Sequence, residues 1–270
     1  MISRRIFLAS PAALAAQRIL EIAPAAPGLK IGYGRDEFQF GELYRPEGKG
    51  PHPAAVVIHG GYWRARYDLR HIGHFCAALA KAGIAAWSLE YRRIGNAGGG
   101  FPGTFDDVRT GAAHLQEIAT RHALDLKRVA VTGHSAGGHL ALWLGKQHAL
   151  ASRGVVALAP VADLRTAWRL RLSNNAAEEL LGGSPESVPE RYRVASPMEM
   201  LPLGARQRVI HGDRDDVVPP DISRAYVKAA RASGDDCVLI EPKGAGHFEL
   251  IDPEAEAFDL VRDELRKLVE

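Results

Sequence analysis

The stretch VAVTGHSAGGHLA at residues 129–141 decides how this chain folds. Its first four residues are apolar or β-branched, as in a short buried strand, and the residues from Gly138 onward have helical spacing. Between them stands GHSAG at 133–137, a G-x-S-x-G motif on a sharp strand-to-helix turn. Small residues are needed there because larger ones would collide with the tight backbone. The motif predicts that the hydroxyl of Ser135 is held out at the top of a sheet, at a helix N-terminus.

Size and charge limit the classes to which the protein can belong. The chain has 270 residues, of which 46% are hydrophobic and 24% charged, ordinary values for a globular protein. This length suits one α/β domain, and no shift in composition marks a second one, so we expect a single domain over 28–270. The net charge is +2, with Arg4 and Arg5 in the first few residues. The near-neutral remainder argues against a nucleic-acid partner. No apolar run is long enough for stable membrane insertion. The oligomeric state stays open.

Residues 1–27 predict an export signal followed by a linker. SRRIFL at 3–8 resembles a twin-arginine signal, because two arginines precede a weakly apolar run. Small residues at 13–16 and at 23–26 offer two possible cleavage regions. We therefore expect a periplasmic or secreted protein. The alternative is a cytoplasmic protein whose basic start is disordered or forms a short surface helix.

Apolar runs and helical patterns alternate along the rest of the chain. Strands are expected at 38–44 (an edge strand), 53–59, 84–91, 129–132, 154–160, 208–211 and 238–242, and helices at 69–82, 104–122, 220–233 and 253–268. This alternation with short connections predicts a mostly parallel sheet covered by helices on both faces. Residues 162–204 interrupt the alternation, and an insertion of that length is typical of a lid or binding loop.

The two cysteines do not indicate a metal site. Cys76 lies in a helical pattern and Cys237 in a strand pattern, and neither has metal-ligand spacing. We expect two buried free thiols, with a disulfide as the alternative.

A reactive serine needs a base, and the base needs a group that orients it. After a G-x-S-x-G turn the partners follow in the order serine, acid, histidine. The run HGDRDDVVP directly follows the strand at 208–211 and offers three acids, Asp213, Asp215 and Asp216. The carboxyl ends of such strands are where these sheets place their chemistry.

A histidine follows the last predicted strand. His247 stands in GAGHF, where flanking glycines allow the loop to bring the imidazole to the serine. Its place after the acids makes it the candidate general base and then general acid. His134 and His139, close to the serine, are expected to be packing or supporting groups.

Two segments offer N–H donors for an oxyanion. Ala136, directly after the serine, offers one from a helix N-terminus. The run HGGYW supplies the rest, and the N–H of Gly61 is expected to be the donor, with Gly60 or Tyr62 as helper. Tyr62 and Trp63 could also shape the substrate pocket. An ordinary Gly-Gly turn and two core aromatic residues are the alternatives.

The chain from about residue 30 onward resembles the α/β-hydrolases. HGGYW and GHSAGGHLA resemble the lipase/esterase branch, which includes kynurenine formamidases and feruloyl-esterase-like proteins. Further matches are EYRR at 90–93, FPG at 101–103, DDV at 106–108, ASP at 195–197 and GHFELIDP at 246–253. The resemblance implies an α/β-hydrolase fold with helices on both faces of the sheet and a short lid at about 162–204.

The resemblance also implies roles for single residues. Ser135 is the nucleophile, His247 is the base, and Asp215 is the acid because it stands three residues after Gly212. No metal or organic cofactor is implied. One departure is Tyr62, which stands where many relatives have a third glycine. The export signal is another departure, since a formamidase for a cytosolic tryptophan catabolite would not need one.

These residues predict a serine hydrolase that cleaves a small carboxylic ester through an acyl-enzyme intermediate. An arylformamidase that opens the amide of N-formylkynurenine is the first alternative. A small peptidase of the prolyl-oligopeptidase type is the third enzyme, but 270 residues leave no room for its usual propeller domain. A non-catalytic binding module of the same fold is the alternative from another class, and the presence of nucleophile, acid and base argues against it.

Overall fold

The computed structural model describes residues 19, 26 and 28–270. The predicted twin-arginine motif and both predicted cleavage regions, except Ala26, lie outside the described residues. No helix of the described part is both long and apolar enough to span a bilayer.

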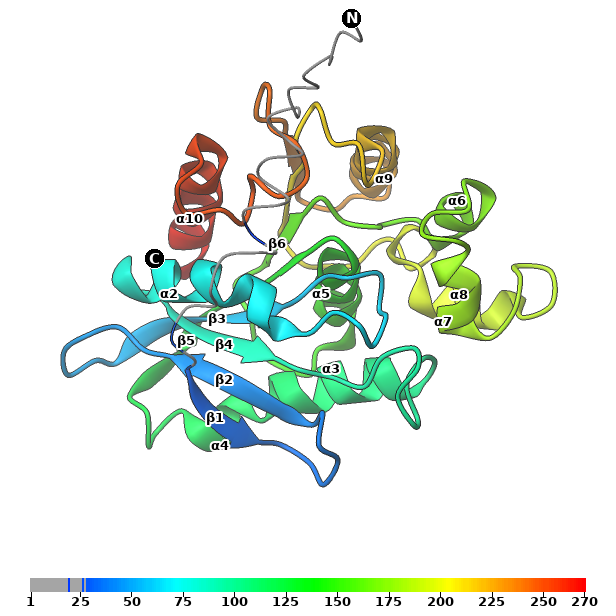
Figure 1. The fold of residues 1–270 in the computed structure, drawn as a ribbon. Helices are drawn as coiled ribbons and strands as arrows, with labels where there is room; N and C mark the ends of the chain where they lie inside the picture. Colours follow the sequence, from blue (N-terminus) through cyan, green and yellow to red (C-terminus); the bar gives the residue numbers. More distant parts are fainter. Residues whose placement is uncertain (1–18, 20–25, 27) are drawn as a thin grey trace, which may run out of the picture.

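One eight-stranded sheet forms the centre of the molecule (Figure 1). Its strands are β1 (Leu29–Gly32), β2 (Phe40–Tyr44), β3 (His52–Ile58), β4 (Ala85–Leu89), β5 (Leu124–His134), β6 (Val155–Leu158), β7 (Gln207–Ile210) and β8 (Cys237–Ile240). The spatial order is β1-β2-β4-β3-β5-β6-β7-β8. β2 runs antiparallel to both β1 and β4, and the other neighbouring strands are parallel. The prediction of a mostly parallel sheet is confirmed.

The strand expected at the edge is not the edge strand. β2 lies between β1 and β4, and β1 occupies the edge instead. β1 has only four residues, LKIG, and three of them are exposed. A short exposed strand has no apolar alternation, so its sequence carries no local signal and its place depends on pairing with β2.

Helices cover both faces of the sheet, as predicted. On one face α2 (Gly73–Lys81), which follows the 3₁₀ turn η1 (Leu69–Ile72), and α10 (Glu256–Val269) pack against Ala55 and Val57. On the other face α3 (Gly103–Ala113) packs against β4, α5 (Ala136–Gln147) against β3, β5 and β6, and α9 (Pro220–Ala232) against β8. Val56 and Ile58 belong to the core on this face. The short α4 (Leu115–Ile118) continues from α3. Since alternate residues of β3 belong to opposite cores, β3 is apolar from Pro53 onward, as expected for a strand that is buried on both faces.

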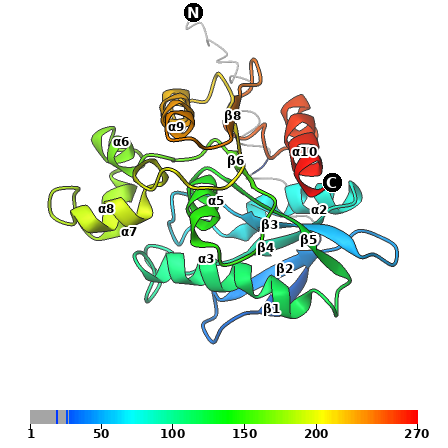
Figure 2. The same cartoon turned by 180° about the vertical axis from the view of Figure 1, so that it is seen from behind.

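The insertion at 162–204 is helical. It contains α6 (Leu164–Arg169), α7 (Ala176–Leu181), α8 (Pro189–Ala195) and the 3₁₀ turn η2 (Pro197–Glu199). Figure 2 shows these helices grouped together to one side of the sheet. Cys76 and Cys237 are both free and buried, as predicted.

Candidate active site

Ser135 stands on the turn between β5 and α5. Its φ is +59° and its ψ is −117°, a conformation that costs energy for a residue with a Cβ. Glycines make the turn possible, because a Cβ at Gly133 would collide with the main chain of Gly137, and one at Gly137 with the carbonyl oxygen of Ile58. The turn is fixed by the N–H of Ser135, which donates to Leu158 O at 2.8 Å.

Asp215 lies in the loop after β7 and is 8% exposed. Its Oδ1 accepts hydrogen bonds from the N–H groups of Val217 and Val218, each at 2.8 Å. Its Oδ2 accepts a bond of 2.6 Å from Nδ1–H of His247, which follows β8. A proton on Nδ1 leaves Nε2 of His247 as a hydrogen-bond acceptor. The structure thus brings the predicted acid and base together.

A second histidine supports the acid. His211 is fully buried, and its Nε2 lies 2.9 Å from Val218 O and 3.1 Å from Asp215 Oδ2, so this nitrogen is the donor. Its Nδ1 accepts from the hydroxyl of Ser223 at 2.7 Å. Burial raises the pKa of Asp215, but the hydrogen bonds from His211 and His247 outweigh it and hold that pKa well below its usual range. Asp215 is therefore ionised at neutral pH.

The other two aspartates of the loop face solvent. Asp213 and Asp216 are exposed, and Oδ1 of Asp213 accepts a bond of 2.6 Å from Gly244 N–H. Asp213 thereby ties the acid loop to the loop that carries the base.

His134 supports the base from the side of the serine. Its Nε2–H donates to the carbonyl oxygen of His247 at 2.9 Å, and the two ring centroids are 4.4 Å apart. Burial and the neighbouring His247 both lower the pKa of His134 well below its ordinary value. His134 is therefore neutral, and it fixes the main chain beside the base. His139 instead donates from Nε2 to Ala195 O at 2.9 Å, away from the serine.

The HGGYW segment packs against the serine turn. A Cβ at Gly60 would lie 2.9 Å from His134 O and 3.2 Å from the Cβ of Ser135. Gly61 has φ +104°, in the region that favours glycine. Ala136 is the first residue of α5, where main-chain N–H groups have no partner within the helix. The predicted oxyanion donors thus lie around the serine, where an anion would find N–H groups and the positive end of a helix.

A buried network, which the sequence pattern alone did not identify, holds this segment. His59 places Nδ1 2.8 Å from Gly60 O and Nε2 3.1 Å from the carboxylate of Glu90, at the end of β4. Arg93 lies 3.3 Å from the same carboxylate, and Tyr91 donates to His59 O at 2.8 Å. Burial raises the pKa of Glu90, but His59 and Arg93 together lower it by more, so the pKa lies below its ordinary value. The EYRR match at 90–93 was the available signal for these residues.

Ser135 and His247 line one cavity of about 240 Å³. The other lining residues are Gly61, Tyr62, Tyr67, His71, His134, Val217 and Phe248. Tyr62 joins two walls of the cavity, because its hydroxyl donates to Val217 O at 2.9 Å and both residues line the cavity. None of these lining residues comes from 162–204, so the insertion is not the lid of this cavity. The end of the insertion packs against α5 instead, where η2 contacts that helix and His139 and Trp143 donate to the carbonyl oxygens of Ala195 and Val194.

Trp63 does not line the cavity. Its side chain is 1% exposed and meets the ring of His139 edge to face at 5.1 Å. The backbone at Tyr62 and Trp63 has positive φ, +48° and +57°. The side chain of Tyr62 therefore faces the cavity, whereas that of Trp63 is buried in the core. The residue types alone do not predict this difference.

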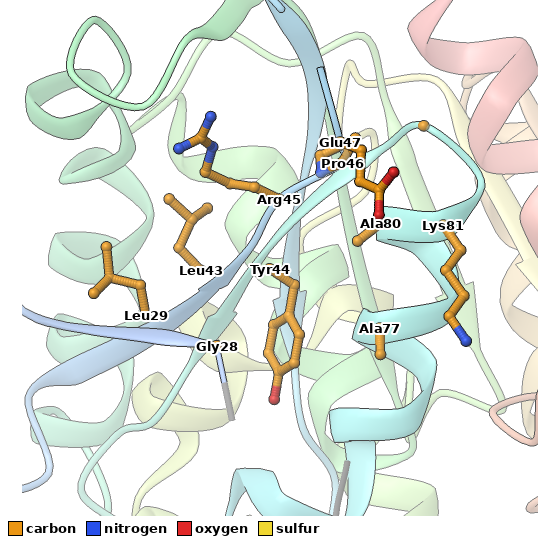
Figure 3. A pocket seen from close by; sticks show the side chains of 11 residues that line it. Gly28, Leu29, Leu43, Tyr44, Arg45, Pro46, Glu47, Ala77, Ala80 and Lys81 are labelled. Atoms are coloured by element: carbon orange, nitrogen blue, oxygen red, sulfur yellow. The ribbon is translucent and has the colours of Figure 1, made fainter. Parts of the chain in front are cut away.

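A larger cavity of about 700 Å³ lies elsewhere and contains none of the predicted site residues. Figure 3 shows it between the end of β2, with Tyr44 and Arg45, and α2, with Ala77 and Lys81. Tyr44 pairs with Ala86 near the amino end of β4, so this larger cavity lies at the edge of the sheet opposite Ser135. Its lining contains no nucleophile with a base beside it. Among the described residues no group of three or more histidine, cysteine or acidic side chains could hold a metal ion.

The sheet, its helices and the reactive edge at the carboxyl ends of β3, β5, β7 and β8 define an α/β-hydrolase. The model of the BD-FAE family matches residues 42–229, and the chain belongs to this family.

Relatives and solved structures agree with this assignment. The chain is 29% identical over 246 residues to Esterase LipC of Mycobacterium tuberculosis (strain ATCC 25618 / H37Rv), covering 83% of this chain but only 60% of that protein's length. Its fold is similar to a truncated carbohydrate esterase from gut microbiota (TM-score 0.77, 22% identity, 92% of this chain and 98% of that chain). It is also similar to esterase B from Lactobacillus rhamnosis (TM-score 0.78, 22% identity, 95% and 90%).

Proposed function

We propose that the protein hydrolyses small carboxylic esters through an acyl-enzyme intermediate, with Ser135 as nucleophile, His247 as base and Asp215 as acid. The observation that carries this proposal is the shared cavity. Ser135, on its strained turn, and His247, bonded to a buried carboxylate, both line it. The names of LipC and of the two similar structures, all esterases, support ester chemistry over amide chemistry.

The reaction has two half-reactions, and His247 takes up and gives back one proton in each. Oγ of Ser135 attacks the ester carbonyl carbon while Nε2 of His247 takes its proton, and Asp215 stabilises the resulting imidazolium through Nδ1–H. The oxyanion accepts hydrogen bonds from N–H groups of the Gly60–Tyr62 segment and of Ala136. Collapse expels the alcohol, which takes the proton from Nε2. Water then attacks the acyl-enzyme, gives a proton to Nε2, and releases the acid as the proton returns to Ser135.

The first experiment compares two substrates. We would measure kcat/KM for p-nitrophenyl acetate and for N-formylkynurenine, with Ser135→Ala as the blank. We expect the ester to be the better substrate and Ser135→Ala to lower its kcat/KM by roughly 10⁴- to 10⁶-fold. A clear preference for the formyl amide would make the enzyme an arylformamidase. Wild-type turnover by Ser135→Ala would remove Ser135 from the mechanism.

A matched pair of variants tests the acid. Asp215→Asn should lower kcat by roughly 10⁴-fold, since the base loses the carboxylate that fixes its tautomer. Asp213→Asn, two residues away in the same loop but exposed, should retain activity within about threefold, like most surface substitutions. The reverse ranking would show that the acid is misassigned.

We further propose that the protein is exported by the twin-arginine pathway, because SRRIFL at 3–8 has that pattern. Fractionation of the native host, followed by N-terminal sequencing, tests this proposal. A periplasmic form shortened at its N-terminus is expected, and a full-length cytoplasmic protein would exclude export.

A further inference from the structure

His71 lines the cavity beside Ser135 and His247 and takes no part in the proposed mechanism. It belongs to η1, and the turn is started by Asp68, whose carboxylate accepts from Arg70 N–H at 3.0 Å. His71 Nδ1 lies 2.7 Å from the carbonyl oxygen of Asp68. Since a carbonyl can only accept, the proton is on Nδ1, and Nε2 carries a free lone pair.

The ring is held in place and is neutral. It meets the buried ring of His59 edge to face, with centroids 5.8 Å apart. Burial, and next the neighbouring His59, lower the pKa of His71 to about 4. Near neutral pH its Nε2 is therefore an acceptor and not a charged donor.

Nothing in the described part of the chain donates to this nitrogen. The remaining walls of the cavity are largely aromatic or apolar, from Tyr62, Tyr67, Val217 and Phe248. Tyr62 already uses its hydroxyl proton on Val217 O. His71 is half-buried and lines the cavity, so water can serve this acceptor while the cavity is empty. A molecule that fills the cavity displaces that water and binds better when it brings its own donor.

We propose that Nε2 of His71 accepts a hydrogen bond from a hydroxyl group of the substrate. The enzyme thereby selects esters with a hydroxyl close to the ester bond over esters of equal size with a methyl group there. This inference rests on the proposed ester hydrolysis and adds a substrate class to it. The cavity of about 240 Å³ suits an acyl or alcohol group of a few heavy atoms with one such donor.

Two pairs of isosteric esters test the proposal on either side of the ester bond. On the acyl side they are p-nitrophenyl glycolate and p-nitrophenyl propionate, and on the alcohol side 2-hydroxyethyl acetate and propyl acetate. The measured quantity is the ratio of kcat/KM within each pair, divided by the same ratio for hydroxide-catalysed hydrolysis. This normalisation removes the intrinsic reactivity of the hydroxylated ester.

We expect the normalised ratio for one pair to be about tenfold in favour of the hydroxyl in the wild-type protein, the usual value of a neutral hydrogen bond. In His71→Leu that ratio should fall to about one, and His71→Gln, which keeps an acceptor, should restore part of it. His52→Leu, at the amino end of β3 and away from the cavity, is the histidine control and should keep the wild-type ratio.

A wild-type ratio near one for both pairs would overturn the inference, and so would a ratio that His71→Leu leaves unchanged. The wild-type ratio decides the matter even if His71→Leu fails to fold. Failure of the proposed function looks different, because Ser135→Ala would then hydrolyse all four esters as fast as the wild type.

Discussion

Two segments follow parallel strands and reach the same edge of the sheet, and only one of them lines the reactive cavity. The cavity wall, residues 59–71 after β3, provides Gly61, Tyr62, Tyr67 and His71. The insertion, residues 162–204 after β6, is three times as long and provides none of the lining residues. The wall is held by the buried carboxylate of Glu90, which contacts His59, whereas the insertion packs against α5. The length and irregularity of a segment therefore do not predict whether it lines the cavity. Its position depends on the side chains that it packs against.

We expect the largest effect from removing the carboxylate of Glu90, which holds the wall through His59. Glu90→Ala leaves His59 and Arg93 buried without their carboxylate, which should cost about 3–5 kcal/mol of unfolding free energy. The displaced segment should also lower kcat/KM by about 100-fold, the usual effect of losing an oxyanion donor. Denaturant unfolding and ester hydrolysis measure both quantities.

Glu199→Ala is the matched control in the insertion, where Glu199 pairs with Arg165 at 2.8 Å in a partly exposed position. It should cost less than about 1 kcal/mol and leave kcat/KM unchanged. If Glu90→Ala is unfolded, Glu90→Gln keeps the shape and removes only the charge. Full activity of a folded Glu90 variant would contradict the supporting role.

Low pH should lower the stability of both regions, through His71 in the wall and His139 next to the insertion. The pKa of His71 in the wall and of His139 beneath the insertion is lowered by burial to about 4, from an unfolded value near 6.5. Between these values the unfolded chain binds more protons, so stability is fully present above about pH 6.5 and is lost as the pH falls toward 4. Each histidine can contribute at most about 1.4 kcal/mol per pH unit.

Unfolding free energies at several pH values between 7 and 4.5 check this prediction. His139→Leu should flatten the slope without abolishing it, because the variant lacks one of the histidines whose pKa burial lowers, while His134 and His71 remain. A stability that is constant over this range would show that neither histidine is held neutral.

A single hydroxyl provides a sharper comparison. Tyr62→Phe removes the bond to Val217 O that joins the wall to the acid loop, and Tyr192→Phe removes a bond to Gly183 O within the insertion. Both should cost about 0.5–1.5 kcal/mol. Only Tyr62→Phe should lower kcat/KM, by several-fold, because only Tyr62 lines the cavity. Equal kinetic effects would mean that the insertion also shapes the site.

The smallest effect is expected at the link between the two regions. Arg64 in the wall pairs with Glu179 of the insertion at 2.6 Å and donates to Ser173 O at 2.7 Å. Since the pair is partly exposed, Arg64→Ala should cost less than about 1 kcal/mol and change kcat/KM by less than about twofold. A loss above tenfold in steady-state assays would show that the insertion controls the wall.

The central strands could be predicted because their signal is local: a strand that is buried on both faces is a continuous apolar run, as from Pro53 to Ile58. The sequence also predicted that Ser135, Asp215 and His247 lie at or after the carboxyl ends of β5, β7 and β8, and they do. β1 and the position of the insertion could not be predicted, because they depend on pairing and packing with distant segments.

The lining of the cavity was predicted in part, since Gly61, Tyr62, Ser135 and His247 were expected at the site and line the cavity, whereas His71 was not identified. His71 falls within a predicted helix at 69–82, and only the 3₁₀ turn at its start aims the ring at the cavity. His211 stands in the run that offers the acids, but its support of Asp215 depends on Ser223 in α9. Such roles depend on contacts between elements that are distant in sequence, and hydrophobic periodicity does not predict these contacts.

The left-handed backbone at Ser135 has an evolutionary consequence. This conformation costs about 1–3 kcal/mol for a residue with a side chain. Ser135→Gly would remove that strain, but it would also stabilise the unfolded chain by about 0.4–1 kcal/mol because glycine has more conformational freedom there. A copy released from selection for catalysis therefore gains stability by drifting to glycine at this position. A glycine there in a descendant would mark a chain that keeps the scaffold for another use.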